Sequence, residues 1–322
     1  EKESALVVGT FGRAIWVLDD LKSLREIVRG NTKEKITSLP MNEVIQVKGL
    51  FIAPPGNIWT GFGTTFEGEN RPFQEAAIPI YINDIPSKED KVKGFILNSK
   101  GDTIQQLTAQ VLMQGLNYMQ WKLDENRVYL SGNYDPNESR GIPVLPGTYI
   151  AVIKYKGVQS STSIKVISDP RFKMKEEVDQ ELYRYNKALN FEVGRLKSFF
   201  NLINSWESEL KKIHETLSKQ TKNEKALKNV NGMIEMVKQL KLVGKDSPGD
   251  RQVGAWQSVR ITPASAINEA EKVAMARVDI PSEQDWKRIS DAATLIDNYK
   301  LQLSQFEDSS WKKFIKLYRK SN

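Results

Sequence analysis

The sequence predicts a multidomain β-plus-α protein: a small antiparallel β-sandwich followed by an antiparallel helical bundle. Two observations carry this prediction. Residues 76–170 contain short apolar runs that alternate with polar residues and are separated by Gly, Pro and Asn, as in sheets with one solvated face. Residues 171–322 instead repeat apolar side chains every three or four positions, which is the period of an amphipathic helix. A length of 322 residues leaves room for two or three domains.

The first 30 residues predict a β-hairpin and a short helix. Residues 5–10 and 14–18 are apolar runs on either side of a Gly-Arg turn, so we expect both strands to be buried on both faces. A two-stranded hairpin is marginally stable alone, and these strands therefore need a larger sheet. Residues 31–75 are expected to be a linker that packs on the body of the protein, with one strand at 47–54.

Five further segments are expected to be strands of the sandwich: 76–84, 92–102, 115–124, 146–157 and 159–169. The last two are expected to pair as a hairpin around the Lys-Gly sequence at 156–157. Residues 125–145 are polar and rich in turn residues, and we expect them to form a long loop that does not pack.

A long amphipathic helix is expected to begin near Glu176, because its apolar stripe continues in steps of three or four over ten turns. Thr221 opens a capping box for a second helix, which ends at the Gly- and Pro-containing stretch 244–250. Thr262, followed by proline, caps a third helix. Ser282 caps a fourth, whose stripe extends to the C-terminal aromatic residues. Helices with one apolar face each bury those faces together, which predicts an antiparallel bundle.

Composition excludes several classes of function. The absence of cysteine excludes disulfides, thiol catalysis and cysteine metal sites. No run approaches the ~20 apolar residues of a membrane-spanning helix, so no membrane span is predicted. Residues 171–322 hold 28 Lys and Arg against 21 Asp and Glu, which places the net charge of +7 in this half. Its aromatic residues lie on apolar helix faces, so we expect a solvated basic surface and no nucleic-acid partner.

No catalytic, cofactor-binding or metal-ligating residue is predicted, and no cofactor is expected. His214 is the only histidine, so it forms neither a multi-histidine metal site nor a convincing catalytic triad. We expect it to be partly exposed on a helix surface. Asp19 and Asp20 are neighbours on a strand and point to opposite faces. Glu176 and Glu177 lie in the first turn of a helix, where negative charge is favourable.

Trp59, Phe62 and Phe66 are the one candidate ligand or interaction surface. They form either an exposed aromatic platform for a sugar or a cluster that pins a loop to the body of the protein. We favour the packing role, and the sugar platform stays open as the alternative.

Residues 6–26, LVVGTFGRAIWVLDDLKSLRE, resemble the closing strands of the β-propeller in secreted bacterial proteins with BNR/Asp-box repeats. These are the sortilin-like and glycosyl-hydrolase-like propeller proteins common in Bacteroidota. Phe11 stands where the family pattern has histidine, and Ala14 stands where it has glycine. The stretches GFILNSKGDTIQQL, GLNYMQWKL and VLPGTYIAVIKYKG resemble, in order and spacing, an FlgD-type immunoglobulin-like domain.

The resemblance implies a domain order. Residues 1–30 would be the terminal strands of a propeller blade with a short helix, and 31–75 the linker. Residues 76–170 would be the FlgD-like immunoglobulin-like sandwich, and 171–322 the C-terminal helical bundle. The chain would be the C-terminal part of an exported protein that is periplasmic, secreted or at the cell surface, with its signal peptide and Asp-boxes upstream of Glu1.

The expected function is that of a non-catalytic accessory and interaction region that buttresses the propeller. Its expected partners are the upstream propeller and another surface protein or a glycan. Two alternatives stay open: part of a sialidase-like glycoside hydrolase whose catalytic residues lie upstream, or a cell-surface adhesion or assembly module. Function lies in sites rather than folds, so the resemblance alone does not choose among them.

Overall fold

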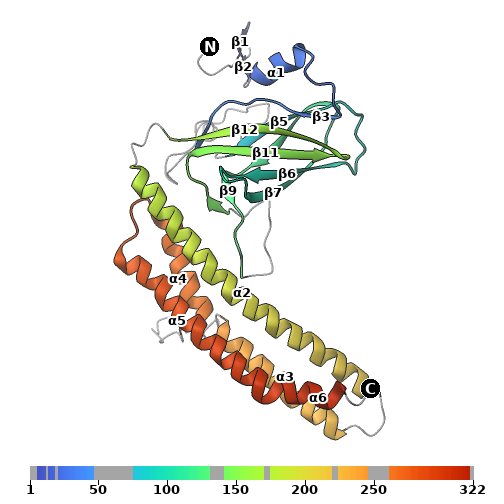
Figure 1. Cartoon of the computed structure of the whole chain (residues 1–322), viewed down its shortest axis with the longest axis vertical. Coiled ribbons are helices and arrows are strands. Elements are labelled where there is room, and N and C mark those ends of the chain that lie inside the picture. The colour runs from blue at the N-terminus through green and yellow to red at the C-terminus, as the bar shows by residue number, and fades with distance from the viewer. Residues whose placement is uncertain are drawn as a thin grey trace. The chain divides into compact units, whose positions relative to one another are not determined.

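A computed structural model describes residues 6–11, 14–18, 21–46, 75–130, 141–169, 175–219, 224–245 and 261–319. The chain forms two compact units. The first consists of Glu1–Arg127 and Pro136–Glu176, and the second of Val128–Asp135 and Glu177–Asn322. The described part of the first unit contains the strands and one short helix, and that of the second contains the long helices (Figure 1). The expected order of β structure followed by α structure is confirmed.

The two largest sheets in the described part of the first unit have five and three strands. One has five strands in the order β4-β12-β11-β6-β7, and the other has three strands in the order β3-β5-β8. The strands of the larger sheet are β4 (Val44–Gln46), β6 (Lys91–Leu97), β7 (Thr103–Gln110), β11 (Gly147–Tyr155) and β12 (Val158–Ser168). Those of the smaller sheet are β3 (Ile36–Ser38), β5 (Ala76–Ile82) and β8 (Gly115–Trp121).

Side chains from both sheets form one apolar core. The sheets approach closely at Gly94 of β6, where a Cβ atom would lie 2.3 Å from the Met119 sulfur of β8. Trp121 is fully buried and packs edge-on against Tyr149 of β11, with ring centroids 5.3 Å apart. The Tyr149 hydroxyl donates a 2.6 Å hydrogen bond to the backbone carbonyl of Leu145, which fixes the start of β11.

Residues 36–46, expected in the linker, instead supply one short strand to each sheet. β3 pairs antiparallel with β5, whereas β4 pairs parallel with β12, as in Val44 opposite Val166. The larger sheet is therefore mixed rather than purely antiparallel. A strand of three residues shows almost no alternation of apolar and polar residues, so the sequence does not reveal it. Whether such a segment forms a strand depends on the neighbouring strands with which it pairs. The expected strand at 47–54 lies outside the described residues.

The expected strand 92–102 is wrong at its C-terminal end, and β7 was not expected. β6 ends at Leu97 because the Asn98 side-chain oxygen accepts hydrogen bonds from the backbone amides of Lys100 and Asp102. Such side-chain turns compete with strand pairing. Gly101, with φ of +85°, completes the turn that leads into β7.

The expected loop at 125–145 packs at both of its described ends. β9 (Asp124–Glu125) pairs with β10 (Ile142–Pro143). The buried Asp124 carboxylate accepts hydrogen bonds from the Gly141 amide at 2.5 Å and from the Gln105 side chain at 3.1 Å. Polar residues pack here because their hydrogen bonds are satisfied.

A short helix, α1 (Leu21–Val28), confirms the helix expected after the opening strands. Its buried Ser23 donates a hydrogen bond of 3.1 Å to the carbonyl of Pro40. This contact ties α1 to the segment between β3 and β4.

The second unit is built from five described α-helices: α2 (Glu176–Ser218), α3 (Glu224–Gly244), α4 (Pro263–Ala276), α5 (Glu283–Phe306) and α6 (Lys312–Arg319). Thr262 and Ser282 cap α4 and α5 as expected, each accepting a hydrogen bond from the backbone amide three residues later. The residues expected to cap α3, 221–223, lie outside the described residues.

The apolar stripes of these helices form one core, as expected for the helical half. Tyr185 near the start of α2 is fully buried and hydrogen-bonds to the backbone of α4 and α5. Residues 128–130 also belong to this unit: the Val128 amide donates a 2.7 Å hydrogen bond to the Asn190 side chain of α2.

A π-helical turn at Glu307–Trp311 separates α5 from α6. The apolar stripe has a step of five residues here, from Phe306 to Trp311. A regular α-helix would rotate Trp311 by roughly 140° from that face over five residues. The wider π turn keeps both rings against Trp206 of α2, with centroid distances of 5.3 and 5.5 Å.

Candidate functional site

The N-terminal hairpin exposes an apolar strand. β1 (Leu6–Thr10) pairs antiparallel with β2 (Ala14–Leu18), and among the described residues no other strand pairs with either. Leu6, Val7 and Val8 are 46%, 61% and 44% exposed. Adjacent side chains on a strand point to opposite faces, so both faces of β1 present apolar groups to solvent.

This hairpin has the properties of a strand donor. Its outer edges carry backbone groups that a second sheet is able to pair with, and its side chains are apolar on both faces of β1. Exposed Phe11, next to the turn, extends the apolar surface. The expectation that this strand is buried on both faces is wrong for β1, because among the described residues no larger sheet pairs with it and its side chains stay exposed.

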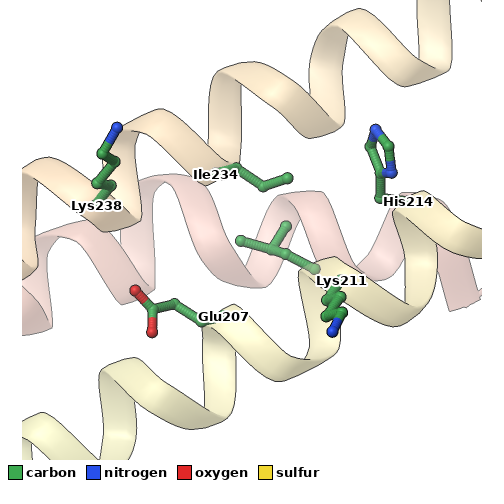
Figure 2. Close-up of a pocket in the computed structure, with 6 residues that line it drawn as sticks. Glu207, Lys211, His214, Ile234 and Lys238 are labelled. Carbon is green, nitrogen blue, oxygen red and sulfur yellow. The ribbon is translucent and has the colours of Figure 1, made fainter.

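A second candidate surface is a groove between α2 and α3, with a volume of about 350 Å³. Figure 2 shows Glu207, Lys211 and His214 projecting from α2, and Ile234 and Lys238 from α3. Leu210 also lines the groove and is itself almost fully buried. We call this feature the α2–α3 groove and define it by these six residues.

Positive charge dominates the rim of the α2–α3 groove. Its one acidic lining residue, Glu207, forms a 2.5 Å ion pair with Lys241 of α3. Lys238 lies 3.7 Å from Glu235 of the preceding turn. In the described parts of the chain Lys211 forms no ion pair of 4 Å or less. The rim therefore offers cationic groups above an apolar floor.

One end of the first unit is fixed by an ion pair. Lys156 lies in the β11–β12 turn with φ of +44°, and its ammonium is 2.8 Å from the Asp90 carboxylate. The hydrogen bond from Lys156, with others from Ser87 and Tyr155, holds the pKa of Asp90 well below its usual range. The hydrogen bond to Asp90 in turn raises the pKa of Lys156. This pair joins two loops and is structural.

The other strongly perturbed groups serve packing or capping. Burial raises the pKa of Tyr149 to about 12. Burial of Asp285 works to raise its pKa, but hydrogen bonds from Ser282 and the Arg277 guanidinium, 2.6 Å away, outweigh it and lower the pKa. Asp285 completes the cap of α5.

The residues singled out from the sequence fall in different places. Trp59, Phe62 and Phe66, the aromatic candidate surface, lie outside the described residues, as do Asp19 and Asp20. His214 is half-buried on the surface of α2, as expected, and lines the α2–α3 groove. Glu176 and Glu177 begin α2 and are exposed.

The lysines of the groove were missed by sequence reasoning. Lys211 and Lys238 lie on different helices, and only folding brings them to one groove. The available signal was the spacing of residues 207, 211 and 214, which share one face of α2 at helical period.

Within the described ranges, no group of three or more His, Asp or Glu residues is placed to hold a metal ion. A search of the same residues finds no helix that is both long and apolar enough to cross a membrane. No protein-family model and no curated protein matches this chain.

Proposed function

We propose that this chain is a non-catalytic accessory and interaction region of a larger exported β-propeller protein. In this proposal the β1–β2 hairpin completes the propeller sheet, while the two units buttress it and contact a protein or glycan partner. The observation that carries the proposal is the exposed apolar strand β1, with Leu6, Val7 and Val8 all in solvent.

The free energy available at the hairpin supports a docking role. Fully burying a Val or Leu side chain stabilises by about 1.5–3 kcal/mol. Leu6, Val7 and Val8 are each about half exposed, so covering all three would contribute roughly 3 kcal/mol. Backbone pairing with a neighbouring strand adds to this figure.

The first unit has features of an immunoglobulin-like sandwich, which supports the FlgD-type resemblance. Its two sheets share one core, and buried Trp121 packs against Tyr149. The Tyr149 hydroxyl bonds to a carbonyl four residues upstream, as in the tyrosine corner of such domains. The helical unit has the shared apolar core of a bundle. Both units are suited to act as scaffolds.

A matched pair of substitutions in the native host tests the proposal. Val7→Lys places a charge on β1, and Leu301→Lys places one on α5 at nearly equal exposure, 61% against 60%. In this chain expressed alone, both variants should melt within about 2 °C of the unsubstituted chain, because exposed sites have small effects. In the native protein, Val7→Lys buries an unpaired charge and should reduce the folded amount several-fold.

Protein levels and thermal midpoints are measured for both variants in both settings. The proposal predicts loss only for Val7→Lys and only in the native protein. Equal levels of the two variants in the native host would contradict it.

A further inference from the structure

The α2–α3 groove combines apolar lining residues with two lysines: among the described residues Lys211 forms no ion pair of 4 Å or less, whereas Lys238 lies 3.7 Å from Glu235. Leu210 and Ile234 are the apolar residues of the lining and are taken as its floor, and Figure 2 shows Lys211 and Lys238 projecting from opposite helices. The acidic residue in the lining, Glu207, is already paired with Lys241 at 2.5 Å. A bound partner therefore meets cations on both sides of an apolar strip.

The form of the groove favours a helix as its occupant. From Glu207 to His214 the groove follows two turns of α2, a length of roughly 10 Å. A helix lying along it places apolar side chains, three or four residues apart, on Leu210 and Ile234. An extended peptide would instead leave backbone N–H and C=O groups unpaired over this apolar floor, whereas a helix satisfies its own.

The lysines of the groove indicate which charged residues the partner helix carries. Acidic side chains on both flanks of its apolar stripe would reach Lys211 and Lys238. A second copy of the same face would bring lysines against lysines, which is unfavourable. Charge complementarity therefore selects an acidic partner and disfavours self-association through this face.

We propose that the α2–α3 groove binds an acidic amphipathic helix of a partner protein. The site lies wholly within the helical unit and does not depend on the proposed docking of the hairpin. Because the contact is small, it belongs to the weak, transient class of interfaces, with a dissociation constant between about 10 µM and 1 mM.

The probes are two synthetic peptides of about 14 residues, long enough to cover both turns. Both carry Leu at helical spacing, and one carries Glu on both flanks of that stripe where the other carries Lys. Binding to the 322-residue chain is measured by fluorescence anisotropy, and hydrogen exchange locates the contact. The Glu peptide should bind at least tenfold more tightly than the Lys peptide and protect residues 207–214 and 234–238.

Charge-reversal variants give a second, matched comparison. Lys211→Glu with Lys238→Glu changes the groove, while Lys212→Glu with Lys228→Glu makes the same charge change on exposed positions of the same helices outside its lining. The groove variant replaces two exposed ion pairs with the peptide by repulsions, so its affinity for the Glu peptide should fall about tenfold. The control variant should retain binding within about twofold.

Several results would overturn the proposal. These are equal affinity for the two peptides, no saturation at about 1 mM Glu peptide, protection outside the groove, or equal weakening in both charge-reversal variants. Saturable binding of dodecanoate at these residues without binding of the Glu peptide would assign the groove to an anionic amphiphile instead. The peptide comparison uses the unsubstituted chain, so it decides the matter even if a variant misfolds.

Discussion

Replacing Gly244 by Ala should destabilise the helical unit, although Ala is the better helix former. A Cβ at Gly244, the last residue of α3, would lie 2.5–2.7 Å from the ring and hydroxyl of Tyr299. Tyr299 is held in place, because its hydroxyl donates a 2.9 Å hydrogen bond to the Leu240 carbonyl and its ring contacts Phe199 and Phe200. Overpacking costs about 1–3 kcal/mol, which exceeds the gain of up to about 1 kcal/mol in helix propensity.

Gly232 of the same helix supplies the control. Nothing lies within 4 Å of a Cβ built there, so Gly232→Ala should stabilise α3 by about 0.5–1 kcal/mol. The two variants should then differ by about 2 kcal/mol, which corresponds to thermal midpoints roughly 4–8 °C apart for a unit of this size. Thermal unfolding followed by helical circular dichroism measures the difference. A midpoint for Gly244→Ala equal to or above that of Gly232→Ala would refute the packing argument.

Three further substitutions test the account elsewhere. Tyr149→Phe removes the hydroxyl donor at the start of β11 and should cost about 1 kcal/mol in urea unfolding; an unchanged midpoint would contradict the role given to that bond. The lowered pKa of Asp90 stabilises the fold above the ordinary carboxyl pKa of about 3.9, and this stability is lost as the pH falls. Asp90→Asn should therefore flatten the acid limb of a stability–pH profile, and an identical limb would show that Lys156 contributes nothing there. Trp206→Ala removes a ring packed on two others and should cost about 3–5 kcal/mol by denaturant titration, whereas a loss below about 1 kcal/mol would mean that the π turn repacks.

The helical unit was largely predictable because its signals are local. Apolar residues at helical spacing predicted α2, and the caps at Thr262 and Ser282 were visible as short sequence patterns. Capping bonds join residues three positions apart, so no long-range information is needed. The π turn was not expected, although the five-residue step from Phe306 to Trp311 was present in the stripe.

The sheets were less predictable because their pairing is long-range. β4 joins β12 in parallel across more than a hundred residues of sequence, and its three residues carry no period of their own. β7 was not predicted because it is rich in polar side chains. One of them, Gln105, is accommodated in the fold by a hydrogen bond to the Asp124 carboxylate, a partner that is distant in the sequence. The turn at Asn98 that separates β6 from β7 depends on one side chain.

The two candidate surfaces also differ in whether a local or a long-range signal specifies them. The apolar runs of the opening hairpin predicted strands buried in a larger sheet, whereas Val7 and Val8 are exposed; the need for a larger sheet stays a prediction. The α2–α3 groove depends on the alignment of two separate helices, which brings Lys211 and Lys238 together. No local pattern in either helix specifies that alignment.

The intact mass of the protein purified from its native host tests the central claim most directly. If the chain is the accessory region of a larger propeller protein, the mass lies several tens of kilodaltons above the 36.6 kDa of these residues. A mass of 36.6 kDa would contradict that claim. The exposed hairpin would then have to pair with a separate partner.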